Sequence, residues 1–245
     1  MPASEHLQRH YHNFYTSGED SEWRRLGAIG KADNIIRAWH SRSVQEPRRP
    51  HVVELGCGDG AVAARLVELD FFASYRGFDI SDSGIARAKS RAIRGAEFAV
   101  CSTTIPMDND SADVVIMSHV IEHLEHPREL INEAHRIASL LIAEVPLELN
   151  RGLADDYDWD PVGHINKYSR KAIRQLIQTC RFDVLDQFTT NRSREVAEFH
   201  RPGAVSSVKW AIKQSALRLA PNVARSQFTY HETLIAKRND RQHPR

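Results

Sequence analysis

His51-Val52-Val53-Glu54-Leu55-Gly56-Cys57-Gly58-Asp59-Gly60, followed further along by Gly77-Phe78-Asp79-Ile80, is the part of this 245-residue chain that decides its fold. A short apolar run that ends at glycines is typical of a buried parallel strand. Glycine lets the backbone turn sharply and approach a ligand without a Cβ in the way. A helix is expected to begin near Gly60, with its unpaired N–H groups facing the same place. Asp79 ends a second strand, where a carboxylate can bind both hydroxyls of a ribose. We therefore expect a nucleoside-containing cofactor at this turn.

The spacing of the glycines argues against two common nucleotide-binding loops. A dinucleotide-binding loop needs Gly-x-Gly-x-x-Gly, whereas the glycines here are Gly56, Gly58 and Gly60. A phosphate-binding loop would end in Lys-Ser or Lys-Thr, and residues 61–64 contain neither. Glu54 is a poor neighbour for a pyrophosphate and a good one for a cation. S-adenosylmethionine carries a sulfonium and an ammonium group and fits this turn better.

The form Glu54-x-Gly56-x-Gly58-x-Gly60 resembles the first motif of the class I S-adenosylmethionine-dependent methyltransferases. The segment Asp113–Pro127 resembles a later motif of small-molecule methyltransferases, including O-methyltransferases of the ubiquinone pathway. The resemblance implies S-adenosylmethionine as cofactor, S-adenosylhomocysteine as product, and a backbone near Ser118 that faces the methionine end. Related enzymes often carry an acid after the third strand, where this chain has Cys101 and Ser102. The residues expected to bind the cofactor are Glu54, Gly56, Cys57, Gly58, Gly60, Asp79, Ile80, Cys101, Ser102, Ser118 and His119.

Strand and helix patterns alternate from residue 51 onward and predict an α/β fold whose parallel sheet is covered by helices on both faces. Residues 226–237 alternate as a last, antiparallel strand at or near the sheet edge would. The resemblance implies the same three-layer, Rossmann-like arrangement with seven mostly parallel strands. Strands are expected near 51–56, 74–80, 96–101, 113–118, 139–146 and 182–189, and helices near 60–69, 82–93, 127–138 and 169–180, with Ser81 and Ser169 as N-caps.

Two segments stand outside this alternation. Residues 1–45 are expected to form an N-terminal helical cap, and residues 46–245 the methyltransferase domain with a lid loop at 147–168. An inserted helix over 203–220 places Val205, Val208, Ile212, Ala216 and Leu219 at helical spacing, with Lys209, Lys213 and Arg218 alongside. Such a helix can pack beside the last strands, lie on a membrane surface or clasp a lipid-linked acceptor. We favour packing.

Composition excludes several other classes of protein. The 33 Lys and Arg and the 32 Asp and Glu leave a net charge of +1, without the basic excess of a nucleic-acid-binding protein. Cys57, Cys101 and Cys180 form neither a disulfide framework nor a zinc-binding spacing. Neither a signal peptide nor a membrane-spanning run is visible. We expect a cytoplasmic protein that binds a small-molecule acceptor, does not bind nucleic acid and is not stably inserted in a membrane. A homodimer is possible.

The acceptor side of the site is expected to lie after the fifth strand. The stretches Ala143–Glu148 and Gly163–Ser169 are similar to an arrangement in bacterial methyltransferases that act on glycans and natural products. Histidine has an intrinsic pKa near neutral, so His164 suits removal of a hydroxyl proton, with Glu148 and His119 as other candidate bases. His164 as a purely structural residue, and catalysis by alignment alone, stay open. The residues expected to bind the acceptor are Tyr15, His123, Tyr157, Trp159 and His164.

The run His119-x-x-Glu122-His123 matches an inverted zinc-protease motif in form only, because it directly follows a buried strand. By the resemblance to some ubiquinone-pathway enzymes, these residues could instead converge on a divalent ion. No oxygen-rich ligand set is visible, so we expect no metal site.

We expect an S-adenosylmethionine-dependent methyltransferase (EC 2.1.1.-) of natural product biosynthesis that acts on a hydroxyl oxygen of a sugar or natural product. An N- or C-methyltransferase, an NAD-dependent oxidoreductase and a catalytically silent methyltransferase-like binding protein are the alternatives. Retention of the glycines and of Asp79 favours an active enzyme.

Overall fold

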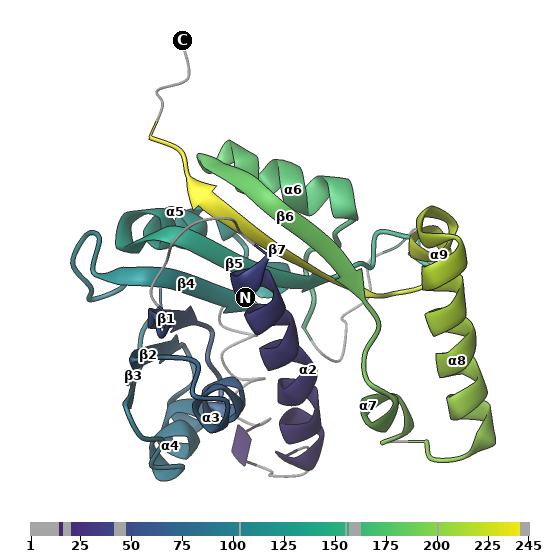
Figure 1. Cartoon of the computed structure of the whole chain (residues 1–245), viewed down its shortest axis with the longest axis horizontal. Helices are drawn as coiled ribbons and strands as arrows, with labels where there is room; N and C mark the ends of the chain where they lie inside the picture. The colour runs from purple at the N-terminus through teal and green to yellow at the C-terminus, as the bar shows by residue number, and fades with distance from the viewer. Residues whose placement is uncertain are drawn as a thin grey trace.

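The computed structural model describes residues 15–16, 21–41, 48–102, 104–154, 156, 163–199 and 201–240. Within these ranges, one seven-stranded sheet has the order β3-β2-β1-β4-β5-β7-β6 (Figure 1). The strands are β1 (His51–Leu55), β2 (Ser74–Asp79), β3 (Ala96–Val100), β4 (Ala112–Ser118), β5 (Ala138–Pro146), β6 (Phe182–Thr190) and β7 (His231–Arg238).

Pairing in this sheet is parallel from β3 through β5 and antiparallel on both sides of β7. The expected antiparallel last strand is therefore confirmed, and it lies next to the edge strand β6. Its expected start at Ser226 is wrong, because Ser226 and Gln227 end the helix α9 (Pro221–Gln227) and β7 begins at His231. Pro221 in the first turn suits a helix start, since it has no N–H to leave unpaired.

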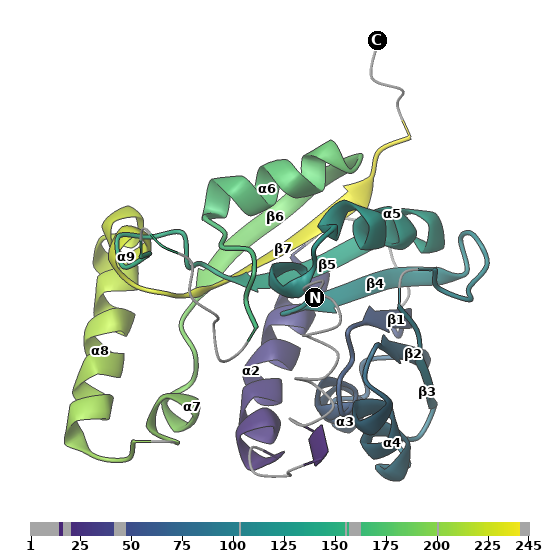
Figure 2. The same ribbon diagram turned by 180° about the vertical axis from the view of Figure 1, so that it is seen from behind.

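Helices cover both faces of the sheet and confirm the three-layer architecture (Figures 1 and 2). One face carries α5 (Pro127–Ile137) and α6 (Arg170–Thr179), whose Ile131 and Ile177 are fully buried in one core cluster. The helices that cover the other face are α2 (Ser21–His40), α3 (Ala61–Glu68) and α4 (Asp82–Ser90).

The predicted N-caps of α4 and α6 are confirmed. The Ser81 hydroxyl accepts a hydrogen bond from the Gly84 N–H at 3.1 Å, and the Ser169 hydroxyl accepts one from the Ala172 N–H at 3.2 Å. These bonds satisfy backbone donors that a helix start would otherwise leave unpaired.

The N-terminal helix α2 is part of a helical layer. Its Ile35 and Trp39 are buried in the same core cluster as Leu66 of α3, and the Trp39 ring meets Phe71 edge-on at 5.9 Å. Residues 1–14, 17–20 and 42–47 lie outside the described residues, so the cap expected over residues 1–45 stays a prediction.

The segment between β6 and β7 forms α7 (Arg194–Glu198), α8 (Ala204–Leu219) and α9. In both views α8 stands away from the sheet (Figures 1 and 2). None of its residues is buried. Ala216 of the expected stripe packs against the cluster of Leu147, Ala224 and Tyr230. The expected packing is wrong for the rest of the stripe, because Val205, Val208, Ile212 and Leu219 are exposed. Across the described ranges, no helix combines the length and the apolar character needed to cross a membrane.

The topology brings the expected site residues to one edge of the sheet. The strand order reverses between β1 and β4, and the carboxyl ends of parallel strands meet beside that point. Gly56 follows β1, Asp79 ends β2, and Ser118 ends β4. The short 3₁₀ helix η1 (Ile121–His123) continues from β4 along the same edge.

Candidate active site

The glycine turn after β1 has a backbone that other residues could not adopt without strain. Gly56 has φ +80°, and a Cβ there would lie 2.1 Å from a methyl group of Val120. Gly58 has φ +53°, and its Cβ would lie 2.3 Å from the hydroxyl oxygen of Tyr15. Both conformations are in the left-handed region that glycine enters freely. The side chain of Tyr15, which is 8% exposed, thus packs directly against Gly58 of the turn.

Asp79 is anchored to this turn by backbone donors. Its Oδ2 accepts a hydrogen bond from the Gly58 N–H at 2.7 Å, and its Oδ1 accepts one from the Ser81 N–H at 2.9 Å. Burial raises the pKa of Asp79, although these backbone hydrogen bonds partly oppose the shift. A carboxylate offers about four lone-pair sites, so Asp79 keeps acceptor capacity for a ribose hydroxyl.

Glu54 lies behind the turn. It is 1% exposed, and the Tyr75 hydroxyl donates a hydrogen bond to its Oε2. Burial raises the pKa of Glu54 to about 7. Its direct contact in the structure is therefore Tyr75, and a role toward the cofactor cation stays a prediction.

Asp59, a residue that sequence reasoning passed over, ties the turn to two helices. Its Oδ2 lies 3.0 Å from Arg24 Nε of α2 and 2.9 Å from an Arg91 guanidinium nitrogen just after α4. The Asp59 carbonyl also accepts a hydrogen bond from Arg91 Nε at 2.6 Å. An acidic residue inside the glycine motif was the sequence signal that could have indicated these ion pairs, because a buried charge requires partners.

The residues after β3 and β4 offer polar groups of different exposure. The Cys101 thiol donates a hydrogen bond to the Thr104 carbonyl at 2.9 Å, and Ser102 is exposed. Ser118 is 6% exposed, and its hydroxyl has no hydrogen-bond partner among the described residues. A buried hydroxyl without a hydrogen-bond partner lowers the stability of the fold, unless a ligand supplies the missing hydrogen bond. Together with the turn and Asp79, Ser118 fits a nucleoside cofactor at this edge.

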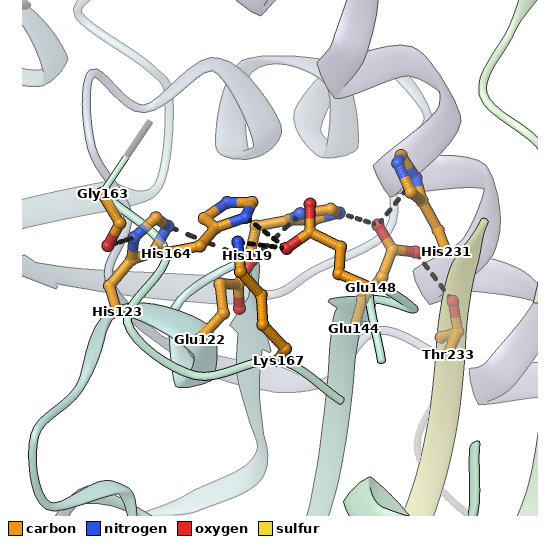
Figure 3. Close-up of polar contacts among 10 residues, drawn as sticks. All are labelled: His119, Glu122, His123, Glu144, Glu148, Gly163, His164, Lys167, His231 and Thr233. Carbon is orange, nitrogen blue, oxygen red and sulfur yellow. Dashed lines mark hydrogen bonds and ion pairs between the residues drawn. The ribbon is translucent and has the colours of Figure 1, made fainter. Parts of the chain in front are cut away.

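Two stretches distant in sequence form the other side of the site. The backbone carbonyl of Glu122 in η1 accepts hydrogen bonds from the N–H groups of Ile165 and Asn166 at 3.0 and 2.9 Å. His123 Nδ1 donates to the Gly163 carbonyl at 2.9 Å, so its neutral ring carries the hydrogen on Nδ1. Burial lowers the pKa of His123. The segment 163–166, at the end of the expected lid loop, is thereby fixed against η1 (Figure 3).

Within this segment, His164 is paired with Glu148. Its Nδ1 lies 2.8 Å from Glu148 Oε2, and Lys167 Nζ lies 3.0 Å from the same oxygen. Burial alone would raise the pKa of Glu148, but the hydrogen bonds from His164 and Lys167 outweigh it and lower the pKa. The His164 ring also meets His123 with ring centres 4.8 Å apart. The structure brings together all of the expected acceptor-side residues that it describes except Tyr15, which lies at the glycine turn.

His119 lies between two buried carboxylates (Figure 3). Its Nδ1 is 3.2 Å from Glu122 Oε1, and its Nε2 is 3.0 Å from Glu144 Oε1. Burial and Lys31 would lower the pKa of His119, but the two glutamates outweigh them and raise it. The same contacts, against the opposing effect of burial, lower the pKa of Glu122 and of Glu144 to about 2. The two carboxylates thus favour the protonated form of His119.

Glu144 is a second residue whose importance was missed. Its Oε2 accepts hydrogen bonds from Asn34 Nδ2 of α2 and from Thr233 Oγ1 of β7, both at 2.7 Å. His231 Nδ1 lies 4.0 Å from its Oε1, and burial lowers the pKa of His231 to about 3. A glutamate inside the apolar run of β5 was a visible signal, but its partners come from other elements.

Two groups of side chains among the described residues bring potential metal ligands within 4.8 Å of one another. They are His119 with Glu144 and His231, and Glu122 with His123 and His164. In the first group, the carboxylate of Glu144 already accepts hydrogen bonds from His119, Asn34 and Thr233. The expected acceptor contacts Tyr157 and Trp159 lie outside the described residues.

Comparisons with known proteins agree with this geometry. A family model described as a methyltransferase domain matches residues 25–187. A "probable S-adenosylmethionine-dependent methyltransferase" of Mycolicibacterium smegmatis is 25% identical over 154 residues, which cover 60% of this chain and 57% of the relative. The matched part of the chain thus spans little more than half the length of this curated relative.

Solved structures show the same fold at low sequence identity. The protein in complex with the Haloferax volcanii Trm112 methyltransferase activator gives a TM-score of 0.67 at 15% identity, over 94% of this chain and 97% of the other. Geranyl diphosphate C-methyltransferase from Streptomyces coelicolor gives 0.59 at 14% identity, over 85% and 78%. These likenesses confirm the Rossmann-like fold.

Proposed function

The chain belongs to the methyltransferase-domain family, and from this premise we propose that it methylates a hydroxyl oxygen of a small molecule such as a sugar or natural product. The cofactor is S-adenosylmethionine, as expected. When bound, it supplies an electrophilic methyl group on a sulfonium, and transfer of that methyl leaves S-adenosylhomocysteine. In this proposal the protein acts in the cytoplasm and in natural product biosynthesis.

Cofactor binding is assigned to the glycine turn and the strand ends beside it. Asp79 hydrogen-bonds the ribose, while Gly56 and Gly58 allow the tight turn to pack against Val120 and Tyr15. The Ser118 hydroxyl, which is buried and lacks a partner among the described residues, binds a polar group of the cofactor.

The pair of His164 and Glu148 is the observation that carries the choice of a hydroxyl acceptor. Glu148, held ionised, accepts from His164 Nδ1, so a neutral His164 presents its lone pair at Nε2. We assign to Nε2 the proton that the hydroxyl loses as its oxygen bonds to the methyl carbon. A hydroxyl needs such a base more than a neutral amine does, because it is the weaker nucleophile until its proton is lost.

The other candidate bases are less suited to this task. Glu122 and Glu144 raise the pKa of His119 and favour its protonated form, which cannot accept a further proton. Glu148 has a lowered pKa and already accepts hydrogen bonds from His164 and Lys167, so it is a weak base and a good orienting group. His119 therefore acts as a fixed positive charge at the end of β4.

Metal-independent transfer is part of the proposal, with a divalent ion as the alternative. The ground for the alternative is the group of Glu122, His123 and His164. Dialysis against a chelator is expected to leave the rate unchanged. A loss of rate that added Mg²⁺ or Zn²⁺ restores would establish the alternative.

Calorimetric titration of the whole protein separates the function classes. S-adenosylmethionine and S-adenosylhomocysteine are expected to bind, and NAD is not. A panel of sugars, phenols and amines with methyl-labelled cofactor then locates the new methyl group on oxygen, nitrogen or carbon by NMR. Binding of the cofactor without transfer to any acceptor would favour a silent binding protein, and binding of NAD alone would refute the proposal.

A further inference from the structure

The arm formed by α8 and α9 presents an apolar stripe to solvent. Its residues in α8 are three, four and seven positions apart and therefore share one face of that helix, and Val223 is an exposed apolar residue of α9. Their exposed fractions are 69% for Val205, 56% for Val208, 54% for Ile212, 85% for Leu219 and 61% for Val223. A soluble monomer rarely leaves such a contiguous set of large apolar side chains uncovered.

Charge on this arm is entirely positive. Residues 199–231 contain five Lys and Arg and no Asp or Glu, although the whole chain has 33 basic and 32 acidic residues. Three of the five are exposed, namely Arg201, Lys209 and Arg218. The other two face inward, since Lys213 donates to the Thr229 carbonyl at 2.6 Å and Arg225 to the Thr189 hydroxyl at 2.8 Å.

The opposite side of the arm is held firmly to the protein. Trp210 Nε1 donates to the Arg192 carbonyl at 2.8 Å, and an Arg194 guanidinium nitrogen donates to the Ser207 hydroxyl at 3.0 Å. The Tyr230 hydroxyl donates to the Lys213 carbonyl at 2.7 Å. The arm therefore stands apart from the sheet in a defined orientation (Figures 1 and 2). The side chains of its stripe are exposed.

We propose that α8 and α9 dock reversibly on an anionic lipid surface. The stripe enters the boundary between headgroups and acyl chains, and Arg201, Lys209 and Arg218 lie among the phosphates. An apolar stripe with exposed basic side chains on either side of it supplies the two signals that reversible membrane anchoring requires. A protein partner of mixed charge would find no acidic side chain to pair with here, whereas an anionic bilayer complements the basic arm. This inference does not depend on the methyl-transfer reaction.

Flotation of the whole protein with lipid vesicles tests the proposal. The protein is expected to float with vesicles of phosphatidylcholine and phosphatidylglycerol at low salt, and not with phosphatidylcholine alone. High salt should release it, because the Debye length shrinks. Lack of binding to the anionic vesicles at low salt would overturn the proposal.

Substitutions locate the binding surface. The double variants Lys209→Glu/Arg218→Glu and Val208→Ser/Ile212→Ser are each expected to lower the partition coefficient by about tenfold or more. The matched control is Lys171→Glu/Leu185→Ser, which changes an exposed lysine and a 43% exposed leucine elsewhere. It should bind as the unchanged protein does. Thermal melting checks that each variant folds.

Equal binding of the arm variants and the control would contradict the assignment. A concentration-dependent dimer in sedimentation velocity that Val208→Ser/Ile212→Ser abolishes would also contradict it. In that case the stripe would be a contact between two copies of the chain.

Discussion

His164 Nδ1 lies 2.8 Å from Glu148 Oε2, across a separation of sixteen residues in sequence. Lys167 binds the same carboxylate oxygen, so Glu148 has both a partner to orient and a cation to hold it in place. A histidine oriented through Nδ1 by a carboxylate is the arrangement that general-base catalysis uses. The proposed role of His164, the proposed ribose contact of Asp79 and the buried charges of Glu122 and Glu144 can each be tested by substitution.

Replacement of His164 by alanine is expected to lower kcat by about 100-fold, because a positioned general base contributes about 10²- to 10⁴-fold. The matched control is His126→Ala, since His126 is exposed and its side chain makes no capping bond at the start of α5. Steady-state kinetics measure both. A His164→Ala rate equal to that of the control would remove His164 as the base and favour catalysis by alignment alone.

Removal of the Asp79 carboxylate is expected to weaken binding of S-adenosylhomocysteine about tenfold or more, because ribose hydrogen bonds to a charged group are lost. The change is Asp79→Ala, followed by calorimetry. Asp82→Ala is the control, since Asp82 is exposed in the first turn of α4. Unaltered affinity in Asp79→Ala would place the ribose elsewhere.

Opposite protonation states are expected for the two histidines beside Glu144. The pKa of His119 is raised, whereas burial lowers the pKa of His231 to about 3. At neutral pH, ¹⁵N NMR of the imidazole rings should therefore show His119 protonated and His231 neutral. Glu144→Gln should lower the pKa of His119. A neutral His119 in the unchanged protein would refute the fixed positive charge at this position.

Stability should fall in acid because of Glu122 and Glu144. Burial opposes their ionisation, but His119 holds the pKa of each at about 2, below the ordinary 4.5. An acid with a lowered pKa stabilises the fold at pH above its unfolded value and loses that contribution as pH falls through the folded value. Urea unfolding should thus show a free energy that declines from about pH 4.5 toward about pH 2. In Glu144→Gln this decline should be shallower, and an unaltered slope would speak against the assignment.

Asp59→Ala should destabilise the fold by about 3 to 5 kcal/mol, the typical cost of leaving a buried charge without its partner. The Arg24 side chain is 8% exposed and the Asp59 side chain 4%, so water cannot replace the lost contact. Glu22→Ala breaks an exposed ion pair with Arg25 of the same helix and should cost far less than Asp59→Ala, because water screens the pair. Chemical denaturation compares the two. Similar costs would mean that the Asp59 pairs contribute little.

The backbone of this protein was predictable because local residue patterns encode it. The alternation of apolar runs and helices placed the first six strands within two residues of their observed starts, from His51 to Phe182. Ser81 and Ser169 were recognisable as N-caps, since a cap depends on residues three positions away. The last strand was placed too early because Ser226 and Gln227 alternate with their neighbours yet belong to α9.

The backbone of the turn and strand ends that we propose to bind the cofactor was predictable for the same local reason. Gly56, Gly58 and Asp79 act through strand ends and a turn, whose spacing the sequence carries directly. Together with the segment Asp113–Pro127, these residues predict the family, and the matched family model confirms it.

Side-chain partners across elements came only from the tertiary structure. Nothing in the sequence pairs Glu144 with Asn34 and Thr233, or Asp59 with Arg24, because those contacts join elements that only the completed sheet brings together. The same holds for the protonation of His119, which depends on burial between two carboxylates. Periodicity likewise identified the apolar stripe of α8, but whether that stripe is covered depends on where neighbouring elements pack. The sequence by itself thus determined the strands, the turn and the cofactor, whereas folding decided which charges meet and which apolar face stays exposed.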